Sequence, residues 1–254
     1  NAQVFNRPSF VWDVTFSGSL MRNRLLEMPE EVPNIIVNTN GTQQHRRCDD
    51  DGTCYPLGGY WERKYTYDDA NGNGIIEPAE VTVEAQQTFI GSPQPTRELA
   101  LNTQFSLFNN RLQIGTTLDY RGGYYQWNLA NDFRCRSRFN CNEMYDISAP
   151  LDEQARMIAN TQKGAQNTTH GYIEKSDFLK WREASITYNA PETWARALRA
   201  DRLSLTLSGR NLAKITDYTG VDPEVNEGVG NFAQRDFLAL PLLRTISMRV
   251  NLTF

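Results

Sequence analysis

The sequence predicts an all-β fold, a transmembrane antiparallel β-barrel with long structured extracellular loops. Segments of about ten residues alternate apolar and polar side chains, as barrel strands do. The connections between these segments alternate between short and very long, and the final segment ends on an aromatic residue, Phe254. Strands of a soluble sandwich also alternate, but short turns on one side and long loops on the other indicate a membrane barrel.

Five segments show this alternation clearly. The first, 10–20, places Trp12 and Phe16 on one side of a strand and Asp13 and Thr15 on the other. The other four cover residues 98–108, 111–120, 202–210 and 244–254. In each, the apolar side suits lipid and the polar side suits a water-filled lumen.

Two local signals refine the strands. Asn109 and Asn110 separate two alternating segments and predict a tight hairpin turn. The segment 178–188 alternates in two phases, one containing Trp181 and the other Ile186. One extra residue in that strand, a β-bulge, reconciles the two phases.

The long connections are expected to hold structure of their own. The region 23–96 and the link from Arg121 to Glu174 are both far longer than ordinary loops of a compact domain. Within the second, residues 150–160 begin with a proline and an aspartate, as a helix N-terminus does. We expect a short helix there and an extracellular position for the region 23–96.

The stretch DANGNGIIEPAE, residues 69–80, has the spacing of a twelve-residue calcium loop. Gly74 stands at the sixth position, where such a loop turns sharply. The predicted oxygen ligands come from Asp69, Asn71, Asn73, the carbonyl of Ile75, Glu77 and Glu80. The alternative is a polar Asn-Gly turn without metal. Strand-like residues flank the stretch, so we expect a structural Ca²⁺ clip rather than a helix-moving switch.

The four cysteines form two close pairs, Cys48 with Cys54 and Cys135 with Cys141. Zinc sites use shorter spacings with matching partners, so two local disulfides are favoured over a metal site. Pairing between the two loops stays open. Disulfides indicate an oxidising compartment outside the cytoplasm.

Composition excludes several classes of function. The chain of 254 residues has a net charge of −4 and a pI near 5.4, which argues against a nucleic-acid partner. No run approaches the roughly 18 apolar residues of a membrane helix. The two histidines, His45 and His170, stand in polar loops without catalytic partners nearby in sequence, and we predict no catalytic residue and no enzyme.

Aromatic and charged residues suggest where a substrate would pass. Tyr124, Tyr125 and Trp127 form an aromatic cluster in the sequence. They belong either to the ring of aromatic residues that a barrel places at the membrane interface, or to the extracellular entrance, where they would contact substrate. By alternation, Asp119, Arg210 and Arg249 face the lumen, as an ion-paired lining or as substrate contacts.

The C-terminal third resembles SusC/RagA-type TonB-dependent outer-membrane transporters. The resemblance is densest over Asp177–Asn226, where the family's FLRLRNVTLGY, SGQNL and Y-x-G-x-D-P-E motifs correspond to FLKWREASITY, SGRNL and YTGVDPE. The last of these is Tyr218–Glu224. A thinner resemblance covers SLFNNRLQIGTTLDYRGGYYQWN, residues 106–128. The calcium loop and cysteines have no counterpart in this family pattern.

The resemblance implies a barrel of about 22 strands filled by an N-terminal plug. It further implies nutrient uptake, of the glycan, oligosaccharide or peptide class, under a SusD-like surface lipoprotein and driven by TonB. Residues 1–254 would then be the C-terminal portion of one barrel domain, with the plug domain and the remaining strands on the same or a separate chain. Phe254 would be the signal that the barrel-assembly machinery reads. The location would be the outer membrane of a Gram-negative-type bacterium, in contact with its lipid.

Two other functions stay open at this point. The chain is alternatively part of a structural or surface-assembly barrel of the outer membrane, which would have a permanently blocked lumen. The other alternative is a secreted calcium-dependent β-sandwich binding module, whose strands would bury their apolar side chains in a soluble core.

Overall fold

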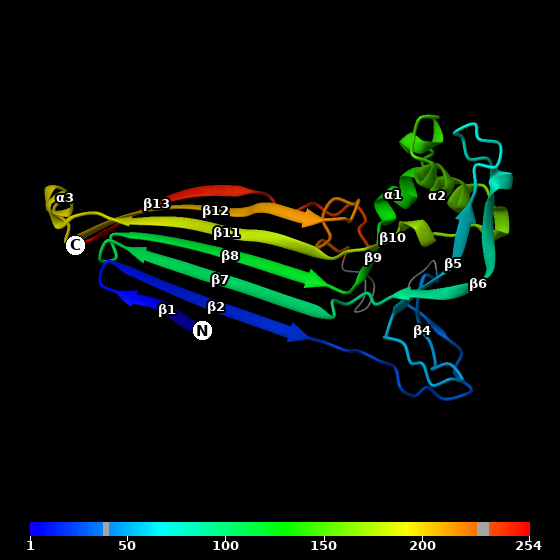
Figure 1. Cartoon of the computed structure of the whole chain (residues 1–254), viewed down its shortest axis with the longest axis horizontal. Coiled ribbons are helices and arrows are strands. Elements are labelled where there is room, and N and C mark those ends of the chain that lie inside the picture. Colours follow the sequence, from blue (N-terminus) through cyan, green and yellow to red (C-terminus); the bar gives the residue numbers. More distant parts are fainter. Residues whose placement is uncertain (38–40, 228–233) are drawn as a thin grey trace.

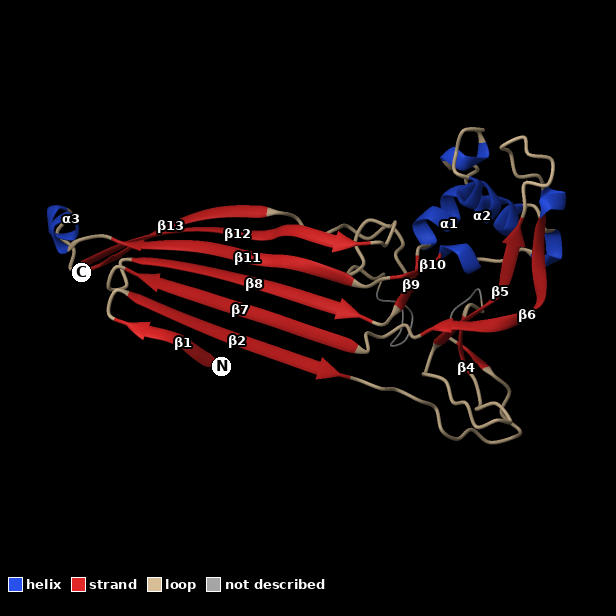
Figure 2. Cartoon of the chain, viewed as in Figure 1, coloured by secondary structure: helices blue, strands red, loops and turns tan. Residues whose placement is uncertain are grey.

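The computed structural model describes residues 1–37, 41–227 and 234–254. The molecule is elongated, with a long sheet at one end and a smaller part containing helices and short strands at the other (Figures 1 and 2). The fold is mostly β and its paired strands are antiparallel, as predicted. None of the helices in these ranges has the length and apolar character needed to cross a membrane.

The long sheet contains seven strands in the order β1-β2-β7-β8-β11-β12-β13. Their bounds are β1 (Ala2–Arg7), β2 (Phe10–Leu20), β7 (Arg97–Leu107), β8 (Leu112–Gly122), β11 (Phe178–Asn189), β12 (Arg202–Thr216) and β13 (Thr245–Thr253). The sheet does not close on itself, because β1 and β13 are its two edges. The sequence patterns predicted all of these strands except β1.

The strand register separates two faces. On the apolar face, Phe105 pairs with Ile114, Ile114 with Ile186, Ile186 with Leu207, and Leu207 with Met248. On the polar face, the pairs include Asn102 with Thr117, Thr187 with Thr206, and Ser208 with Ser247. Because paired residues of antiparallel strands point to the same side, each row extends across neighbouring strands.

The apolar face carries large side chains in contact with solvent. The exposed fractions are 62% for Phe16, 47% for Ile186 and 70% for Met248. A soluble sandwich would bury such a row against a second sheet. The long sheet instead leaves a continuous apolar surface that water does not favour.

The predicted bulge and hairpin are both present. Between Trp181 and Glu183, two steps along β11 match one step along β8, so Arg182 is the inserted residue in that pairing. Against β12 the register shifts at the same place, but there the extra residue lies in β12. The hairpin between β7 and β8 spans four residues rather than two, because Leu107 and Leu112 are the last pair before the turn. At the same end of the sheet, β11 and β12 are joined through helix α3 (Glu192–Ala197).

The part at the other end of the sheet, which we call the cap, comprises the described residues between β2 and β7 and between β8 and β11. Its strands are β3 (Ile35–Ile36), β4 (Gln43–His45), β5 (Gly59–Tyr67), β6 (Val81–Gly91), β9 (Tyr125–Trp127) and β10 (Ile173–Lys175). Its α-helices are α1 (Leu129–Arg136) and α2 (Leu151–Thr161). Short 3-10 turns cover Pro78–Glu80, Asn142–Met144, Gly164–Gln166 and His170–Tyr172.

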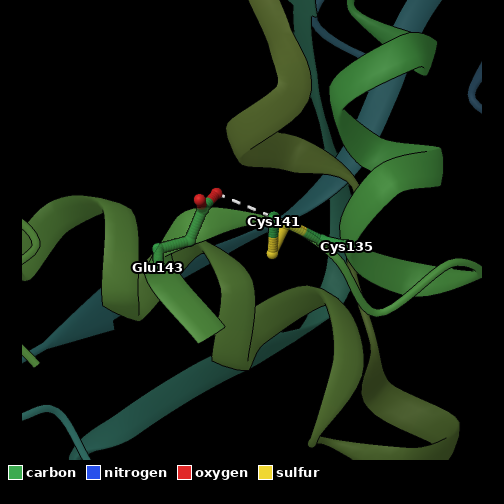
Figure 3. A group of neighbouring side chains, drawn as sticks. All are labelled: Cys135, Cys141 and Glu143. Carbon is green, nitrogen blue, oxygen red and sulfur yellow. Dashed lines mark hydrogen bonds between the residues drawn. A yellow bond between two sulfur atoms is a disulfide. The ribbon is translucent and has the colours of Figure 1, made fainter. Parts of the chain in front are cut away.

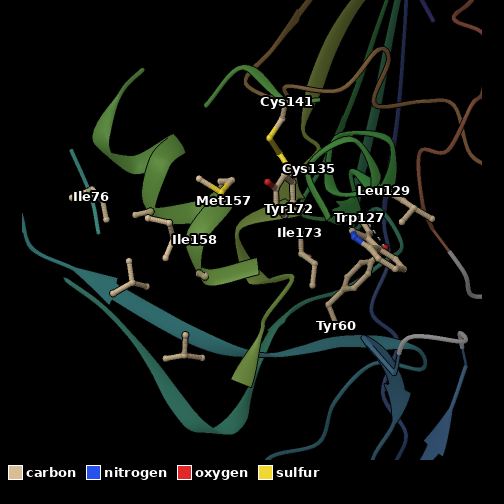
Figure 4. Close-up of a cluster of buried hydrophobic side chains, with 14 residues drawn as sticks. Tyr60, Ile76, Trp127, Leu129, Cys135, Cys141, Met157, Ile158, Tyr172 and Ile173 are labelled. Atoms are coloured by element: carbon tan, nitrogen blue, oxygen red, sulfur yellow. Dashed lines mark hydrogen bonds between the residues drawn. A yellow bond between two sulfur atoms is a disulfide. The ribbon is translucent and has the colours of Figure 1, made fainter. Parts of the chain in front are cut away.

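The buried hydrophobic core lies in the cap rather than in the long sheet. Helix α2, predicted over 150–160, buries Ala155, Ile158 and Ala159 on one face, as the 3.6-residue period requires. These residues belong to one cluster with Tyr60 and Trp127 (Figure 4). The cap is therefore a packed subdomain in which side chains have fixed positions.

Both disulfides are local, which was the favoured pairing. Cys48 is bonded to Cys54 and Cys135 to Cys141. Cys135 and Cys141 lie inside the cap core, whereas the first bridge closes a largely exposed loop. The pairing between loops is therefore wrong.

Candidate functional site

The most extensive charged network lies where the polar face of the sheet meets the loop after β12. We call the described part of that loop, residues 217–227, the strap; it contains the YTGVDPE motif. Lys180, on the polar face of β11, is 4% exposed. Its Nζ lies 2.7 and 2.9 Å from the two carboxylate oxygens of Asp222 and 2.7 Å from Oε2 of Glu224. A buried ammonium requires such partners, so this contact fixes the strap to the sheet.

Arg182, the inserted residue of the bulge, completes the network. Its Nη1 and Nη2 each donate at 2.6 Å to a different carboxylate oxygen of Glu224, which makes the pair bidentate. Its Nε and Nη2 also donate to Oδ2 of Asp119 on β8, at 3.0 and 2.6 Å. Arg182 stands two residues after Lys180 and so shares its side of the strand, and the bulge brings the next residue, Glu183, to the polar side as well.

Two opposing effects act on the pKa of Glu224. Burial raises the pKa of Glu224, but the hydrogen bonds from Arg182 and Lys180 outweigh it and hold the pKa at about 2. Glu224 is therefore ionised throughout the physiological range. The network has three basic groups, because Nη1 of Arg121 on β8 also lies 4.0 Å from Glu224, and three carboxylates. Each of the strap carboxylates contacts a base of β11.

The strap is also bound to the cap. The hydroxyl of Tyr124 donates to the carbonyl of Pro223 at 2.8 Å. Glu174 of β10 accepts the backbone N–H and the hydroxyl of Thr219, both at 2.8 Å. The strap therefore joins the polar face of the sheet to the cap, through one buried and two exposed hydrogen bonds on the cap side.

A second buried carboxylate holds the start of the strap. Asp236, which is almost fully buried, accepts from the Tyr218 hydroxyl and from the backbone N–H of Val221, each at 3.2 Å. Burial raises the pKa of Asp236 and outweighs the hydrogen bonds from Tyr218 and Val221, which lower it.

The predicted aromatic site has a different role in this structure. Tyr124 and Trp127 are buried, and the Trp127 indole donates to Oδ2 of Asp132 at 3.0 Å. Neither faces lipid nor an open vestibule, so neither predicted interpretation describes them; they stabilise the cap. Tyr125 is half-buried against Gly91. The period-two pattern of a strand does not show that the strap and the rest of the cap cover it. The sequence therefore did not predict that Tyr124 and Trp127 are buried.

The predicted lumen-facing charges lie on the polar face, two of them in ion pairs. Asp119 contacts Arg182, and Nε of Arg210 lies 3.2 Å from the Glu183 carboxylate on the neighbouring strand. Arg249 pairs in register with Thr206 of the polar face. For Asp119 and Arg210, the arrangement matches the ion-paired lining.

The first half of the predicted calcium loop is folded around its own oxygens. The two carboxylate oxygens of Asp69 accept the backbone N–H groups of Asn73 and Gly74 at 3.1 and 2.9 Å. The amide oxygen of Asn71 accepts the same Asn73 N–H at 3.0 Å. Gly74 has a φ of 78°, a conformation that favours glycine. The sharp turn predicted at the sixth position is therefore present.

The second half returns to the starting point. The Glu80 carboxylate accepts the backbone N–H of Ala70 at 3.0 Å and that of Glu77 at 2.9 Å, so the twelfth position reaches back to the second. Ile76 is buried, and its N–H donates to the side chain of Gln154 on α2 at 2.9 Å. The loop is thus attached to the cap core through its apolar position, while its oxygen-bearing residues are exposed or half-buried.

One group of His, Cys, Asp or Glu side chains in the described ranges is dense enough to suggest a metal ion, and it lies outside this loop. It comprises Cys135, Cys141 and Glu143 (Figure 3). The two sulfur atoms are bonded to each other and offer no thiolate, and Glu143 lies 3.5 Å from the guanidinium of Arg156. This group is therefore a structural disulfide beside an ion pair.

Sequence relatives are distant but extend over the whole chain. No protein-family model matches it. TonB-dependent receptor P3 of Formosa agariphila is 23% identical over 296 residues, which cover 100% of this chain and 28% of that receptor. TonB-dependent receptor P26 of the same organism is 23% identical over 197 residues, 74% of this chain and 19% of that receptor. The chain thus spans about a quarter or less of the length of these relatives.

Solved structures show where this fold occurs. The structure of the RagAB peptide transporter matches 98% of this chain and 27% of its own, with a TM-score of 0.60 and 14% identity. The RagAB peptide importer in the open-open state matches 99% of this chain and 27% of its own, with a TM-score of 0.65 and 15% identity. The resemblance predicted from the C-terminal motifs is therefore confirmed: the chain is a distant relative of the TonB-dependent receptors and has the fold of about a quarter of a RagAB transporter chain.

Proposed function

We propose that residues 1–254 are the C-terminal portion of the β-barrel of a TonB-dependent outer-membrane transporter that takes up a glycan, oligosaccharide or peptide. The observation that carries this proposal is the two-faced long sheet. Its apolar face would contact lipid and its polar face would line the lumen. The peptide class has additional support, because the solved structures that share the fold are described as peptide transporters.

The open edges of the sheet support a larger barrel. Unpaired backbone groups in hydrocarbon cost several kcal/mol each, so β1 and β13 need partner strands in a membrane. We propose that the remaining strands and the plug, on the same or a separate chain, supply those partners. Phe254, which directly follows β13, would serve as the assembly signal.

We propose that the cap is extracellular and that the end of the sheet carrying α3 faces the periplasm. The two disulfides, the region 23–96 and the long connections all belong to the cap end, which suits the oxidising outer side. A SusD-like lipoprotein would close over the cap, and TonB would act on the plug. In this arrangement the strap lines the lumen beneath the cap, and no residue carries out covalent chemistry.

We further propose that residues 69–80 bind Ca²⁺ as a structural clip. The support is the spacing of oxygen donors and the hydrogen bond that brings the Glu80 carboxylate back to Ala70, next to Asp69. Calcium takes six to eight oxygen ligands at about 2.3–2.6 Å. Some oxygens of this loop that now accept backbone N–H groups would therefore bind the ion instead. The clip would stiffen the β5–β6 hairpin, which α2 packs against.

The test of the transport proposal uses the complete receptor that contains this chain. Cells with and without TonB would be given labelled oligosaccharide and peptide pools, and uptake would be measured. TonB-dependent uptake of one pool is the expected result. An outer-membrane location without TonB-dependent uptake of either would favour the structural barrel. Solubility of the purified chain in detergent-free buffer would favour the secreted module.

A further inference from the structure

Helix α3, in the turn between β11 and β12, exposes the wrong side chains for a helix in water. Trp194 is 58% exposed and Leu198 is 54% exposed, while the small side chain of Ala195 is fully buried. A soluble amphipathic helix would bury its large apolar residues and expose the small ones. Figure 1 places α3 at the end of the long sheet opposite the cap.

The exposed side chains of α3 continue the apolar face of the sheet. The Trp194 ring lies 6.2 Å from the Tyr188 ring, with an interplanar angle of 60°. Tyr188 belongs to the apolar face, because its register partners are Leu112 and Leu205. Leu198 stands four residues after Trp194 and so lies on the same side of the turn. The apolar surface therefore extends past the end of the strands onto α3.

Aromatic and basic groups gather at this end. On the apolar face, the Trp12 and Phe105 rings are stacked 5.6 Å apart near the ends of β2 and β7. The turn between β11 and β12 and the start of β12 contain five charged residues, which are Glu192, Arg196, Arg199, Asp201 and Arg202. Tryptophan beside arginine at the edge of an apolar band is the composition of a membrane–water interface.

We propose that α3 is an interfacial anchor that inserts Trp194 and Leu198 among the phospholipids of the inner, periplasmic leaflet. The proposal rests on the proposed function, since it requires the apolar face to contact lipid. Arg196, which is paired with Glu192, and Arg199 would lie at the level of the lipid phosphates. A phospholipid surface fits this combination of an apolar ridge, continuous with the lipid-facing sheet, and arginines beside it.

The test uses the complete receptor in liposomes of phosphatidylethanolamine and phosphatidylglycerol, with a nitroxide label on one introduced cysteine. All four cysteines of this chain are in disulfides, and any free thiol elsewhere in the receptor would be replaced by serine. The variants are Trp194→Cys, Glu192→Cys as a matched position on the same helix, and Met248→Cys on the apolar face. Collision rates with oxygen, which enters lipid, and with a water-soluble nickel chelate are compared.

We expect the oxygen-to-nickel collision ratio at position 194 to be several-fold higher than at 192 and to approach that at 248. A low ratio at both 194 and 192, with a high ratio at 248, would overturn the anchor and leave the barrel intact. Protection of position 194 from both reagents would mean that a protein covers α3, which also overturns it. A low ratio at 248 would overturn the proposed function and the anchor with it.

Discussion

Lys180 and Asp222 form a buried ion pair, with Nζ 2.7 Å from Oδ1, that joins strand β11 to the strap across 42 residues of sequence. The pair fixes the strap to the polar face at the point where the sheet meets the cap. Arg182 adds a bidentate contact to Glu224 beside it. Ion pairs thus stabilise the boundary between sheet and cap, and substitution of single charged residues tests their contribution.

Replacing Lys180 should strongly destabilise this boundary. The Lys180→Met substitution leaves the buried carboxylate of Asp222 without its base, and losing one partner of a buried pair costs about 3–5 kcal/mol. The matched control is Lys175→Met, because Lys175 is mostly exposed and solvent screens its pair with Asp177, which therefore contributes little. Urea unfolding of the complete receptor in detergent measures both. Equal effects of the two substitutions would show that the Lys180 pair is not structurally important.

Acid should release the strap through Glu224. Its pKa is lowered in the folded state from 4.5 to about 2, so its ion pairs contribute full stability above 4.5. That contribution is lost as the pH falls through this range towards 2. Hydrogen exchange of residues 217–227 measures the release. The Glu224→Gln variant should exchange fast at neutral pH and lose this acid dependence; an unchanged acid profile in the variant would contradict the assignment.

The two disulfides should differ in their importance. Both close loops with a sequence separation of 6, so the loss of loop constraint should cost each about 2 kcal/mol. Cys135→Ser/Cys141→Ser also places hydroxyls in the cap core, which adds about 1–3 kcal/mol if they find no partners. Thermal unfolding would compare this variant with Cys48→Ser/Cys54→Ser. A larger loss for the exposed pair would contradict the burial argument.

Calcium should raise the thermal stability of the cap. Binding to the folded state alone stabilises by about 2.7 kcal/mol at 100 times the dissociation constant. We expect a chelator to lower the melting temperature, and Glu80→Gln to weaken calcium binding in titration calorimetry. Glu84→Gln, at an exposed position of β6 outside the loop, is the control. Identical melting curves with calcium and with chelator would rule out the clip.

Most strands of the long sheet were predictable because alternation is a local property. Even the bulge at Arg182 left a visible mark, since the phase of the pattern changes between Trp181 and Ile186. Strand β1 was missed because Ala2–Arg7 is short and irregular, with a register shift of its own. Helix α3 was missed because six residues are too few for a helical period to show.

The site was harder to predict because its parts are far apart in the sequence. The FLKWREASITY and YTGVDPE stretches were both recognised as motifs, but nothing local indicates that Lys180 meets Asp222. The positions of Tyr124 and Trp127 depend on the strap and cap that cover them, which no periodicity encodes. The roles of Lys180, Tyr124 and Trp127 depend on contacts with residues far away in the sequence and cannot be predicted from residue type.

The central claim, that the apolar face of the long sheet contacts lipid, is tested most directly by a pair of neighbouring substitutions in β11. Ile186 is on the apolar face and Thr187 on the polar face, one residue apart. In the complete receptor in lipid, Ile186→Arg should cost about 2–4 kcal/mol if it lies near the bilayer midplane, whereas an arginine in the lumen is tolerated. The account therefore predicts a large loss of unfolding free energy for Ile186→Arg and little for Thr187→Arg. Equal losses, or a larger loss for Thr187→Arg, would contradict it.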